Sequence, residues 1–387
     1  MTGGGYRVSG SEGEKMNNDR IADALSVIES SDRELAAVFE RRLEAVKTVA
    51  EYRREHGIPV PSEPDGGERA QELSMLIGDA EKRPYYMSFL QGTLSASEKY
   101  HRRIMQGVRV AYTGVKGAFA NIAARRIFPE GDMVSYSDFA SSYEAVERGE
   151  CDCAVLPIEN SYAGEVGQVI ELMFSGSLYI GGVYSLRVKH NLLGLPGATP
   201  ATVKKVVSHP QALHQCAPYI QERGYECIQE SNTAVAAQRV ADGGDPSVAA
   251  IASAETAKLY GLEVLDHDIN ESGDNTTRFA VFSRTPNTDE DHRDRSRFLL
   301  MFILQNEPGA LASAINVIST YGFNMKVIRS RPVKEPAWEY YFYVEAEGDE
   351  ESENGRKMIA ELRQHCRVLK VVGHYSDDIR LGASGII

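Results

Sequence analysis

The sequence has few cysteines, no long apolar run and no excess of basic residues. Five cysteines, an odd number in 387 residues, do not make a disulfide framework. No apolar run approaches the roughly 18 residues that a membrane helix needs, so we expect no membrane span. Lys and Arg number 42 against 55 Asp and Glu, a net charge of −13. Overall charge therefore gives no reason to expect a nucleic-acid partner.

The ends of the chain and its thiols indicate a protein of the reducing cytoplasm. The first twenty residues lack the apolar core of a secretory signal, and we expect residues 1–18 to be a disordered leader. Cys151 and Cys153 have the wrong spacing for a zinc site, and no second pair answers them. We interpret the cysteines as small buried thiols.

A helical pattern covers residues 19–106. Apolar residues recur at three- and four-residue steps, which predicts one helix of about 35 residues; they include Ile21, Leu25, Ile28, Leu35, Val38, Phe39, Val46 and Val49. Prolines between 59 and 64 should end this helix, and further helices are expected near 68–81 and 84–105. So long a helix is not buried by its own chain, which favours a bundle or an intertwined dimer.

The pattern changes to alternating strands and helices over residues 107–284. Short runs such as CAVLPI and RFAVFS are each followed by a turn and an amphipathic stretch, which is typical of an α/β domain with a largely parallel sheet. The polar segment 285–296 is expected to be a linker. Residues 297–376 predict a compact β-α-β-β-α-β domain, and 377–387 a tail.

Polar clusters follow four of the predicted strands in the α/β region. They are the segments 112–119, 157–161, 208–216 and 275–279. Loops at the carboxyl ends of strands are where open α/β sheets bind ligands. A hydroxyl beside a guanidinium, as in Thr277-Arg278, suits a leaving oxygen and a carboxylate. Convergence of the four loops on one site is therefore expected.

These motifs resemble the prephenate dehydratase family, in the family's order: Pro157–Ser161, then Ser208–Gln211, then Thr277-Arg278-Phe279. The resemblance implies a two-lobed fold like that of type 2 periplasmic binding proteins, with the active site between the lobes. It implies that Thr277 is the hydroxyl essential for catalysis. It further implies that the prephenate site is lined by Arg278, Asn160, Ser161, Gln215 and Thr233, with Glu159, Ser208 and Glu230 as weaker candidates.

The chemistry of that family suits these residue types. Prephenate is a dianion that loses carbon dioxide and the ring hydroxyl, and aromatisation drives the reaction. A hydroxyl of high pKa is a poor outright acid, so Thr277 is expected to supply a positioned hydrogen bond to the leaving oxygen. No metal or organic cofactor is needed.

The C-terminal region resembles an ACT regulatory domain. The match rests on two motifs: the turn with Asn306, Pro308, Gly309, Ala310 and Leu311, and the segment Arg329-Ser330-Arg331-Pro332. The second motif usually reads Glu-Ser-Arg-Pro, so Arg329 reverses a charge. The resemblance implies that both motifs bind phenylalanine as an inhibitor. A domain that only dimerises is the alternative.

The helical region resembles chorismate mutases of the intertwined, all-helical type. Arg42 and Arg53 lie on the apolar stripe of the first helix, and Ser97 and His101 continue the stripe of the last. With Arg69, they would bind chorismate. Arginines on a dimer surface are the alternative. The family has Arg where Leu25 stands, Gln at His101 and an acid at Ala70; these departures favour weak or absent mutase activity.

The sequence therefore predicts a cytoplasmic, cofactor-free protein with three parts: an all-α chorismate mutase-like domain, a two-lobed α/β dehydratase domain and an α+β, ferredoxin-like ACT domain. Its expected partners are prephenate, chorismate, phenylalanine and further copies of itself, as a homodimer or homotetramer. The rival hypothesis is a non-catalytic amino-acid sensor that uses the same cleft.

Overall fold

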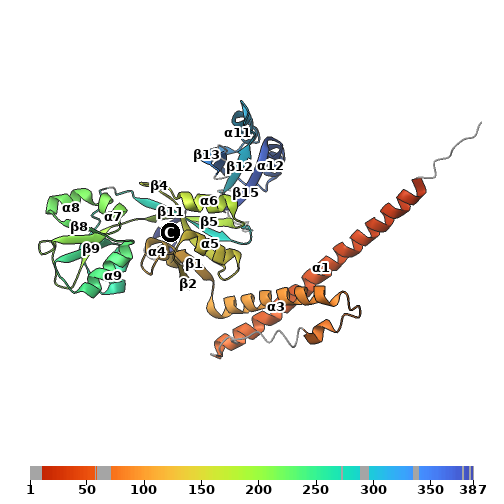
Figure 1. Ribbon diagram of the computed structural model, residues 1–387, viewed down its shortest axis with the longest axis horizontal. Coiled ribbons are helices and arrows are strands. Elements are labelled where there is room, and N and C mark those ends of the chain that lie inside the picture. The colour runs from red at the N-terminus through yellow and green to blue at the C-terminus, as the bar shows by residue number, and fades with distance from the viewer. Residues whose placement is uncertain are drawn as a thin grey trace, which may run out of the picture. The chain divides into compact units, whose positions relative to one another are not determined.

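The computed structural model describes residues 11–56, 58, 71–271, 273–287, 296–333, 340–376, 379–382 and 385–386. The chain forms two compact units, Met1–Gly107 and Val108–Ile387. The division falls where the helical pattern gives way to alternating strands and helices (Figure 1). Within the described ranges, every helix is too short or too polar to cross a bilayer.

Two long helices build the first unit. α1 spans Ser11–Glu55 and α3 spans Arg83–Gln106. α1 therefore begins within the stretch assigned on sequence to a disordered leader. Of the helix expected over 68–81, only 71–74 is helical among the described residues. The expected break at the prolines between 59 and 64 lies outside the described residues, as do Arg69 and Ala70.

The apolar stripe of α1 is covered only near its C-terminal end. Ala50 on α1 and Leu90 on α3 are buried, and both helices contribute to this contact. Farther towards the N-terminus, Leu25, Leu35 and Val38 are 60%, 46% and 51% exposed. Apolar residues at helical spacing that face water indicate a surface made for another protein segment.

The first lobe of the second unit is an eight-stranded sheet with the order β17-β16-β5-β11-β3-β1-β2, and β4 pairs with β3. Its strands are β1 (Arg109–Thr113), β2 (Asp132–Tyr136), β3 (Cys153–Asn160), β4 (Gly164–Glu165), β5 (Tyr179–Arg187), β11 (Thr276–Ser283), β16 (Ile379–Gly382) and β17 (Gly385–Ile386). β1, β2 and β3 are parallel, as expected, whereas β11 runs antiparallel to β3 and β5. The helices of this lobe are α4 (Phe119–Ile127), α5 (Phe139–Glu147) and α6 (Gly167–Ser175).

The second lobe is a five-stranded sheet with the order β10-β6-β9-β7-β8. Its strands are β6 (Asn191–Gly194), β7 (Lys205–Ser208), β8 (Glu226–Gln229), β9 (Val248–Ala252) and β10 (Glu263–Asp266). Its helices are α7 (Pro210–Gln215), α8 (Ala217–Arg223), α9 (Thr233–Gly243) and α10 (Ala254–Tyr260). The chain enters this lobe after β5 and leaves it before β11, and the two crossings are joined by the bond from Val188 N to Asn275 O at 2.7 Å. The two-lobed prediction is confirmed.

The C-terminal domain, residues 296–376, has the predicted β-α-β-β-α-β order. It consists of β12 (Ser296–Leu304), α11 (Ala310–Thr320), β13 (Asn324–Pro332), β14 (Tyr340–Glu347), α12 (Glu353–His365) and β15 (Cys366–Ser376). The four strands form one antiparallel sheet. α11 and α12 cover one face of it, and the other face shares a hydrophobic core with α6 and β5 of the first lobe.

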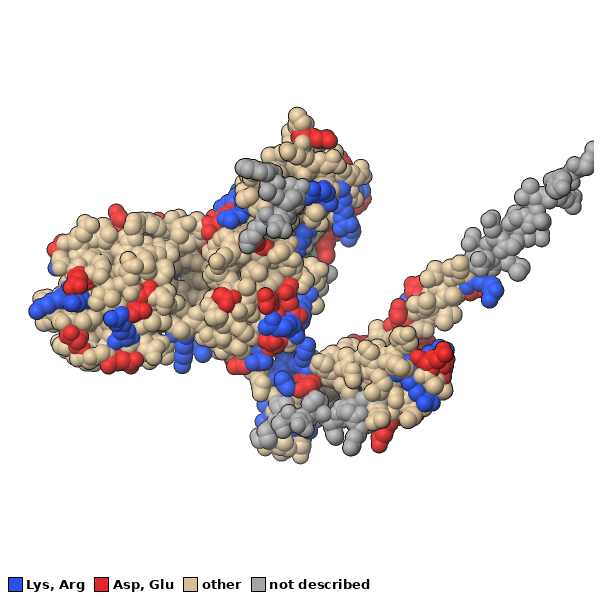
Figure 2. Space-filling view, in the orientation of Figure 1, with Lys and Arg blue, Asp and Glu red and all other residues tan. Residues whose placement is uncertain are grey.

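Two other details differ from the sequence predictions. Residues 379–382, assigned to a tail, form β16 and pair with β5 in the first lobe. All five cysteines are free, but only Cys151, Cys153 and Cys216 are buried, and Cys227 is exposed. On the face drawn in Figure 2, Lys and Arg are interspersed with Asp and Glu, in keeping with the absence of a basic surplus.

Candidate active site

A cavity of about 770 Å³ lies between the two lobes of the second unit. Its walls come from strand ends and from the first residues of helices in both lobes. Among the lining residues are Thr113, Gly114, Ala118, Phe119, Asn160, Glu165, His190, His209, Gln215, Asn232, Thr233, Asn275, Thr277 and Phe279. All four polar segments singled out in the sequence reach this cavity, so their predicted convergence is confirmed.

The hydroxyl of Thr277 has a fixed hydrogen-bond direction. The Oδ1 atom of Asn160 accepts the backbone N–H groups of Tyr162 and Ala163, at 3.0 and 2.9 Å. This fixes the orientation of the Asn160 amide, whose Nδ2 donates to Thr277 Oγ1 at 2.9 Å. Because Thr277 Oγ1 accepts this bond, its own proton is available to a further acceptor in the cavity.

Three more side chains extend this network, in which Gln215 Oε1 accepts from two sides. Asn160 Nδ2 also donates to Asn275 Oδ1 at 2.9 Å, and Asn275 Nδ2 donates to Gln215 Oε1 at 3.0 Å. His190 Nε2 lies 2.8 Å from Gln215 Oε1, which accepts, so Nε2 carries the proton. Gln215 Nε2 and His190 Nδ1 are buried without a partner. Both residues line the cavity, but these two atoms are themselves covered.

None of the described residues that line the cavity is Lys or Arg, so any attraction for an anion must come from backbone and neutral polar groups. Ala118 precedes α4 and has no side-chain cap, so the first N–H groups of that helix remain to be satisfied. Thr233 begins α9 behind its cap Asn232. Both helix starts line the cavity, and helix N-termini favour carboxylates. Gly117, with φ of +89°, makes the turn into α4 that a residue with a Cβ would strain.

The histidines at the cavity are held in the neutral form. Burial lowers the pKa of His190 below its ordinary value, although its hydrogen bond to Gln215 opposes the shift. Burial also lowers the pKa of His209. The Nδ1 atom of His209 accepts the N–H of Gln211 at 3.2 Å and so caps α7. Neither histidine supplies a fixed positive charge.

The structure places Asn160, Gln215, Thr233 and Thr277 in the cavity as predicted, and three other candidates outside its lining. Ser161 Oγ donates to Asp274 O at 3.1 Å and braces the turn beside β11. Ser208 is fully buried and donates to Ile251 O at 2.6 Å. Glu230 forms an ion pair with Arg239 at 2.5 Å. These three have local structural partners.

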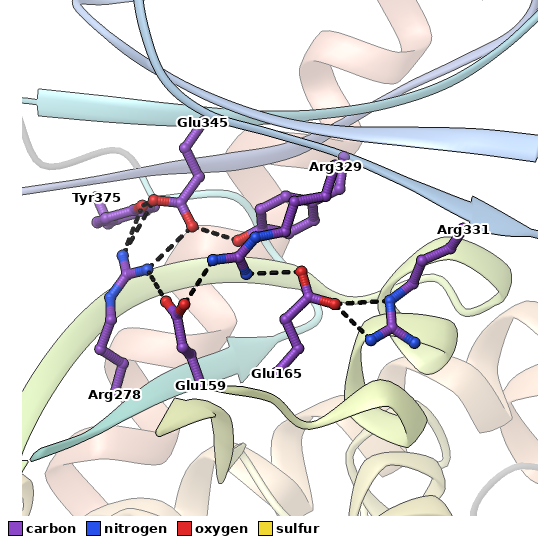
Figure 3. Close-up of polar contacts among 8 residues, drawn as sticks. Glu159, Glu165, Arg278, Arg329, Arg331, Glu345 and Tyr375 are labelled. Atoms are coloured by element: carbon purple, nitrogen blue, oxygen red, sulfur yellow. Dashed lines mark hydrogen bonds and ion pairs between the residues drawn. The ribbon is translucent and has the colours of Figure 1, made fainter. Parts of the chain in front are cut away.

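Arg278 and Glu159 also lie outside the cavity lining, which corrects the expectation that Arg278 holds a substrate carboxylate beside Thr277. Successive residues of a strand point to opposite faces of the sheet, so Thr277 and Arg278 point apart. Arg278 pairs with Glu159 and with Glu345 of the C-terminal domain, each at 3.1 Å (Figure 3). The guanidinium therefore belongs to the contact between domains.

The site contains residues that sequence reasoning did not assign. His190 and Asn275 continue the hydrogen-bond chain, and Phe119 packs edge-on against His190 with ring centroids 5.7 Å apart. Asn275 stands two residues before Thr277, and Phe119 ends the glycine-containing turn after the first strand. Both therefore lie in segments that the sequence already marked as parts of the site. His190 carried no such signal, because it lies in one of the crossings between lobes.

The candidate chorismate-binding side chains meet on α1 and α3. Arg42 Nε donates to Ser97 Oγ at 3.0 Å, and Arg53 Nη1 lies 3.5 Å from His101 Nε2. Burial, with the nearby charge of Arg53, lowers the pKa of His101. Ser97 and His101 are buried. The four side chains thus form two separate pairs between α1 and α3.

The candidate effector residues divide between two places. The turn with Asn306, Pro308 and Gly309 is exposed, and Ala310 and Leu311 begin α11 behind it. On β13, Ser330 and Pro332 are exposed, whereas Arg329 and Arg331 reach Glu159 and Glu165 of the first lobe. Both arginines are thus occupied by carboxylates of the same chain, which differs from their expected role towards an effector.

Comparisons with known proteins agree with this arrangement. Residues 110–287 match the family model "Prephenate dehydratase". "Arogenate dehydratase/prephenate dehydratase 2, chloroplastic" of Arabidopsis thaliana is 34% identical, over 81% of this chain and 83% of its own. "Bifunctional chorismate mutase/prephenate dehydratase" of Aquifex aeolicus is 29% identical, over 92% of this chain and 98% of its own. A solved structure of prephenate dehydratase in complex with L-Phe from Arthrobacter aurescens has a TM-score of 0.65 and 26% identity, over 70% of this chain and 90% of that one.

Proposed function

The chain belongs to the prephenate dehydratase family, and we propose that it converts prephenate to phenylpyruvate, carbon dioxide and water. The observation that carries this proposal is the direction of the hydrogen bonds at Thr277. Asn160 donates to the hydroxyl and so leaves the hydroxyl proton for a leaving oxygen. A protein that only binds a ligand has no need of a donor held in this way.

In the proposed reaction, the bond to the ring carboxylate breaks and its electron pair enters the ring as carbon dioxide leaves. The C–O bond of the ring hydroxyl breaks, and the departing oxygen takes a proton to become water. Thr277 donates a hydrogen bond to that oxygen, a contribution of about 3–4 kcal/mol for a positioned donor. The N-termini of α4 and α9 bind the carboxylates.

Prephenate fits the cavity better than arogenate, which carries an ammonium group in place of the keto group. Glu165 is the one carboxylate among the lining residues, and it is paired with Arg331 and Arg329. An ammonium group would therefore find no free carboxylate there. Steady-state rates with each compound test this: a larger kcat/KM for arogenate would contradict the assignment.

The first experiment supplies purified protein with prephenate and measures phenylpyruvate, using Thr277→Ala and Thr277→Ser as paired variants. We expect turnover by the wild type and by Thr277→Ser. Thr277→Ala should lose about 10²–10³-fold in kcat, while calorimetry still detects the bound substrate or product. Wild-type protein that binds prephenate without turnover would favour the rival hypothesis of an amino-acid or keto-acid sensor.

The first unit is a chorismate mutase-like domain of weak activity. Its support is the group formed by Arg42, Arg53, Ser97 and His101, whose cations and hydroxyl suit a dicarboxylate. Leu25, where the related mutases have Arg, is 60% exposed on α1 and offers no charge. Chorismate supplied alone, with phenylpyruvate as the readout, tests this. Turnover equal to that with prephenate would contradict weak mutase activity.

The enzyme acts in the cytoplasm. Two copies of the chain associate there through the exposed apolar side of α1. Leu25, Leu35 and Val38 at helical spacing support an intertwined helical dimer, because such a stripe is stabilised when another helix covers it. Sedimentation of the intact protein as a single chain at micromolar concentration would contradict this association.

The C-terminal domain is an ACT domain that lowers dehydratase turnover when phenylalanine binds. Its β-α-β-β-α-β order and the exposed turn at Asn306–Gly309 before α11 support this, since the N–H groups of a helix N-terminus can receive an amino-acid carboxylate. Calorimetry that detects no binding at millimolar phenylalanine would contradict the proposal.

A further inference from the structure

Six charged side chains form a continuous cluster between the first lobe and the C-terminal domain (Figure 3). We name it the interdomain ion cluster. Its members are Glu159, Glu165 and Arg278 from the lobe, with Arg329, Arg331 and Glu345 from the C-terminal domain. Three carboxylates and three guanidinium groups balance each other in charge.

The buried end of the cluster is held by several donors. Glu345 is 1% exposed and accepts two bonds from Arg278, each at 3.1 Å, and one from Tyr375 at 2.9 Å. Burial alone would raise the pKa of Glu345, but Arg278 and the phenol donors keep it below its usual value. A buried carboxylate with this many partners fixes how the two domains dock.

The other end of the cluster reaches the cavity wall. Arg331 Nε donates to Glu165 Oε2 at 2.7 Å, and Arg329 Nη1 lies 2.6 Å from Glu165 Oε1. Arg331 also lies against the backbone of Gly167, where a Cβ would come within 2.7 Å of its Nη1. Glu165 and the neighbouring Gly164 line the cavity, so the arginines hold a piece of its wall from behind.

The held segment is directly connected to the catalytic hydroxyl. Residues 161–163 form the turn between β3 and β4, and this turn supplies the N–H groups of Tyr162 and Ala163 that orient the Asn160 amide. Asn160 in turn orients Thr277. A displacement of Glu165 therefore moves the turn that fixes the direction of the catalytic hydrogen bond.

We infer that Arg329 and Arg331 of the C-terminal domain are positioning residues for the dehydratase site, acting through Glu165. The inference rests on the dehydratase function proposed above. The arginines have two effects on this wall: they hold the β3–β4 turn in place, and they neutralise a carboxylate that would otherwise repel a dianionic substrate. The C-terminal domain is thus a structural part of the active site, and Arg329, where related domains carry Glu, serves a contact inside the chain.

The test measures kcat and KM for prephenate in the full-length R331Q and R329Q/R331Q variants. The matched control is K326Q, which removes a cation from the same strand whose partner, Glu347 at 2.8 Å, lies within the C-terminal domain. We expect kcat/KM to fall about 10-fold or more in R329Q/R331Q, because misplacement of a positioning group by ~1 Å can cost about 10²-fold. K326Q should match the wild type.

Two further readouts separate positioning from general loss of structure. The unpaired carboxylate should raise KM, and added salt should lower that KM again in R329Q/R331Q but not in the wild type, since salt screens repulsion. In a double-mutant cycle, R331Q should add little to E165Q, because both remove the same contact. If R331Q is poorly folded, the conservative variant R331K is used in its place, and it should retain most of the activity.

If the wild type is active and R329Q/R331Q has the same kcat/KM, the inference is overturned and the proposed function stands. Fully additive effects of R331Q and E165Q also overturn it, because the arginine would then act by another route. Wild-type protein without prephenate turnover overturns the proposed function, and the inference fails with it.

Discussion

Replacing Asn160 with Asp should silence the catalytic hydroxyl while leaving the shape of the site almost unchanged. The side chains are isosteric, and the oxygen that accepts the N–H groups of Tyr162 and Ala163 is retained. The Nδ2 donor, 2.9 Å from both Thr277 Oγ1 and Asn275 Oδ1, becomes a carboxylate oxygen, so the bond to Asn275 is lost as well. Thr277 must then donate its proton to that oxygen in a charge-assisted bond. The hydroxyl can therefore no longer donate a hydrogen bond to the leaving oxygen.

The expected loss is large and falls mainly on kcat. Removing one positioned donor costs about 2.7–4 kcal/mol, or about 10²–10³-fold in kcat. The added charge also repels the substrate, by roughly 3 kcal/mol at ~5 Å with an effective dielectric constant of ~20, and this raises KM. Both parameters are read from initial rates of phenylpyruvate formation, with thermal unfolding to show that N160D is folded.

A double-mutant cycle makes the reasoning refutable. T277V removes the hydroxyl and retains its volume, so in that background N160D should lower kcat less than it does in the wild type, and the loss that remains measures the broken bond to Asn275. T277S, which keeps the hydroxyl, should respond to N160D as the wild type does. A kcat for N160D within about threefold of the wild type would show that the direction of this hydrogen bond is immaterial to the reaction.

Three further predictions concern other parts of the chain. H190F should lower kcat/KM about 5-fold, because it leaves Gln215 Oε1 without the donor at 2.8 Å and one hydrogen bond contributes roughly 1 kcal/mol; H190Q, which can still donate to Gln215, should lose less in the same assay. His374 lies 3.0 Å from Glu350 Oε1, and this hydrogen bond raises its pKa above the ordinary 6.5. Its stabilising effect is therefore complete below pH 6.5 and is lost as the pH rises through the raised pKa; unfolding temperatures should fall across that range, and less steeply in H374Q. L25R should increase phenylpyruvate formation from chorismate roughly 10-fold or more if a cation is the missing element of the mutase site; unchanged formation would place the defect elsewhere.

The sequence was sufficient to predict the division of the chain and the meeting of its polar loops. The change from a helical to a strand period marks the boundary at Gly107, and strand ends in an α/β fold lie at one edge of each sheet. Asn160, Gln215 and Thr277 could therefore be expected in one cavity, where the structure has them. The meeting of the loops depends on local periodicity, which a single sequence carries, whereas the choice of these three residues came from the family resemblance.

Predictions that depended on side-chain direction succeeded less often. Arg278 follows Thr277 in a motif, but the two-residue period of a strand turns them to opposite faces. The pairing of β11 with β3 also contains a bulge. Arg278 pairs with Glu159 and Phe279 with Pro157, so Ile158 of β3 is an extra residue. This extra residue shifts the alternation of side chains along β3. No local pattern specifies such a bulge, although it is what allows both Pro157 and Asn160 to line the cavity.

The alternation at Thr277 and Arg278 explains why the site and the domain contact depend on each other. Thr277 of β11 presents its hydroxyl to the cavity, and the next residue binds Glu345 of the C-terminal domain from the opposite face. A strand is stiff along its length, so a shift of Arg278 cannot be absorbed before Thr277. The same holds on the neighbouring strand, where Glu159 binds Arg329 and Asn160 orients Thr277. On two adjacent strands, the residue that binds the C-terminal domain is thus next to a residue that lines the cavity, and we expect a change in how that domain docks to alter the proposed active site.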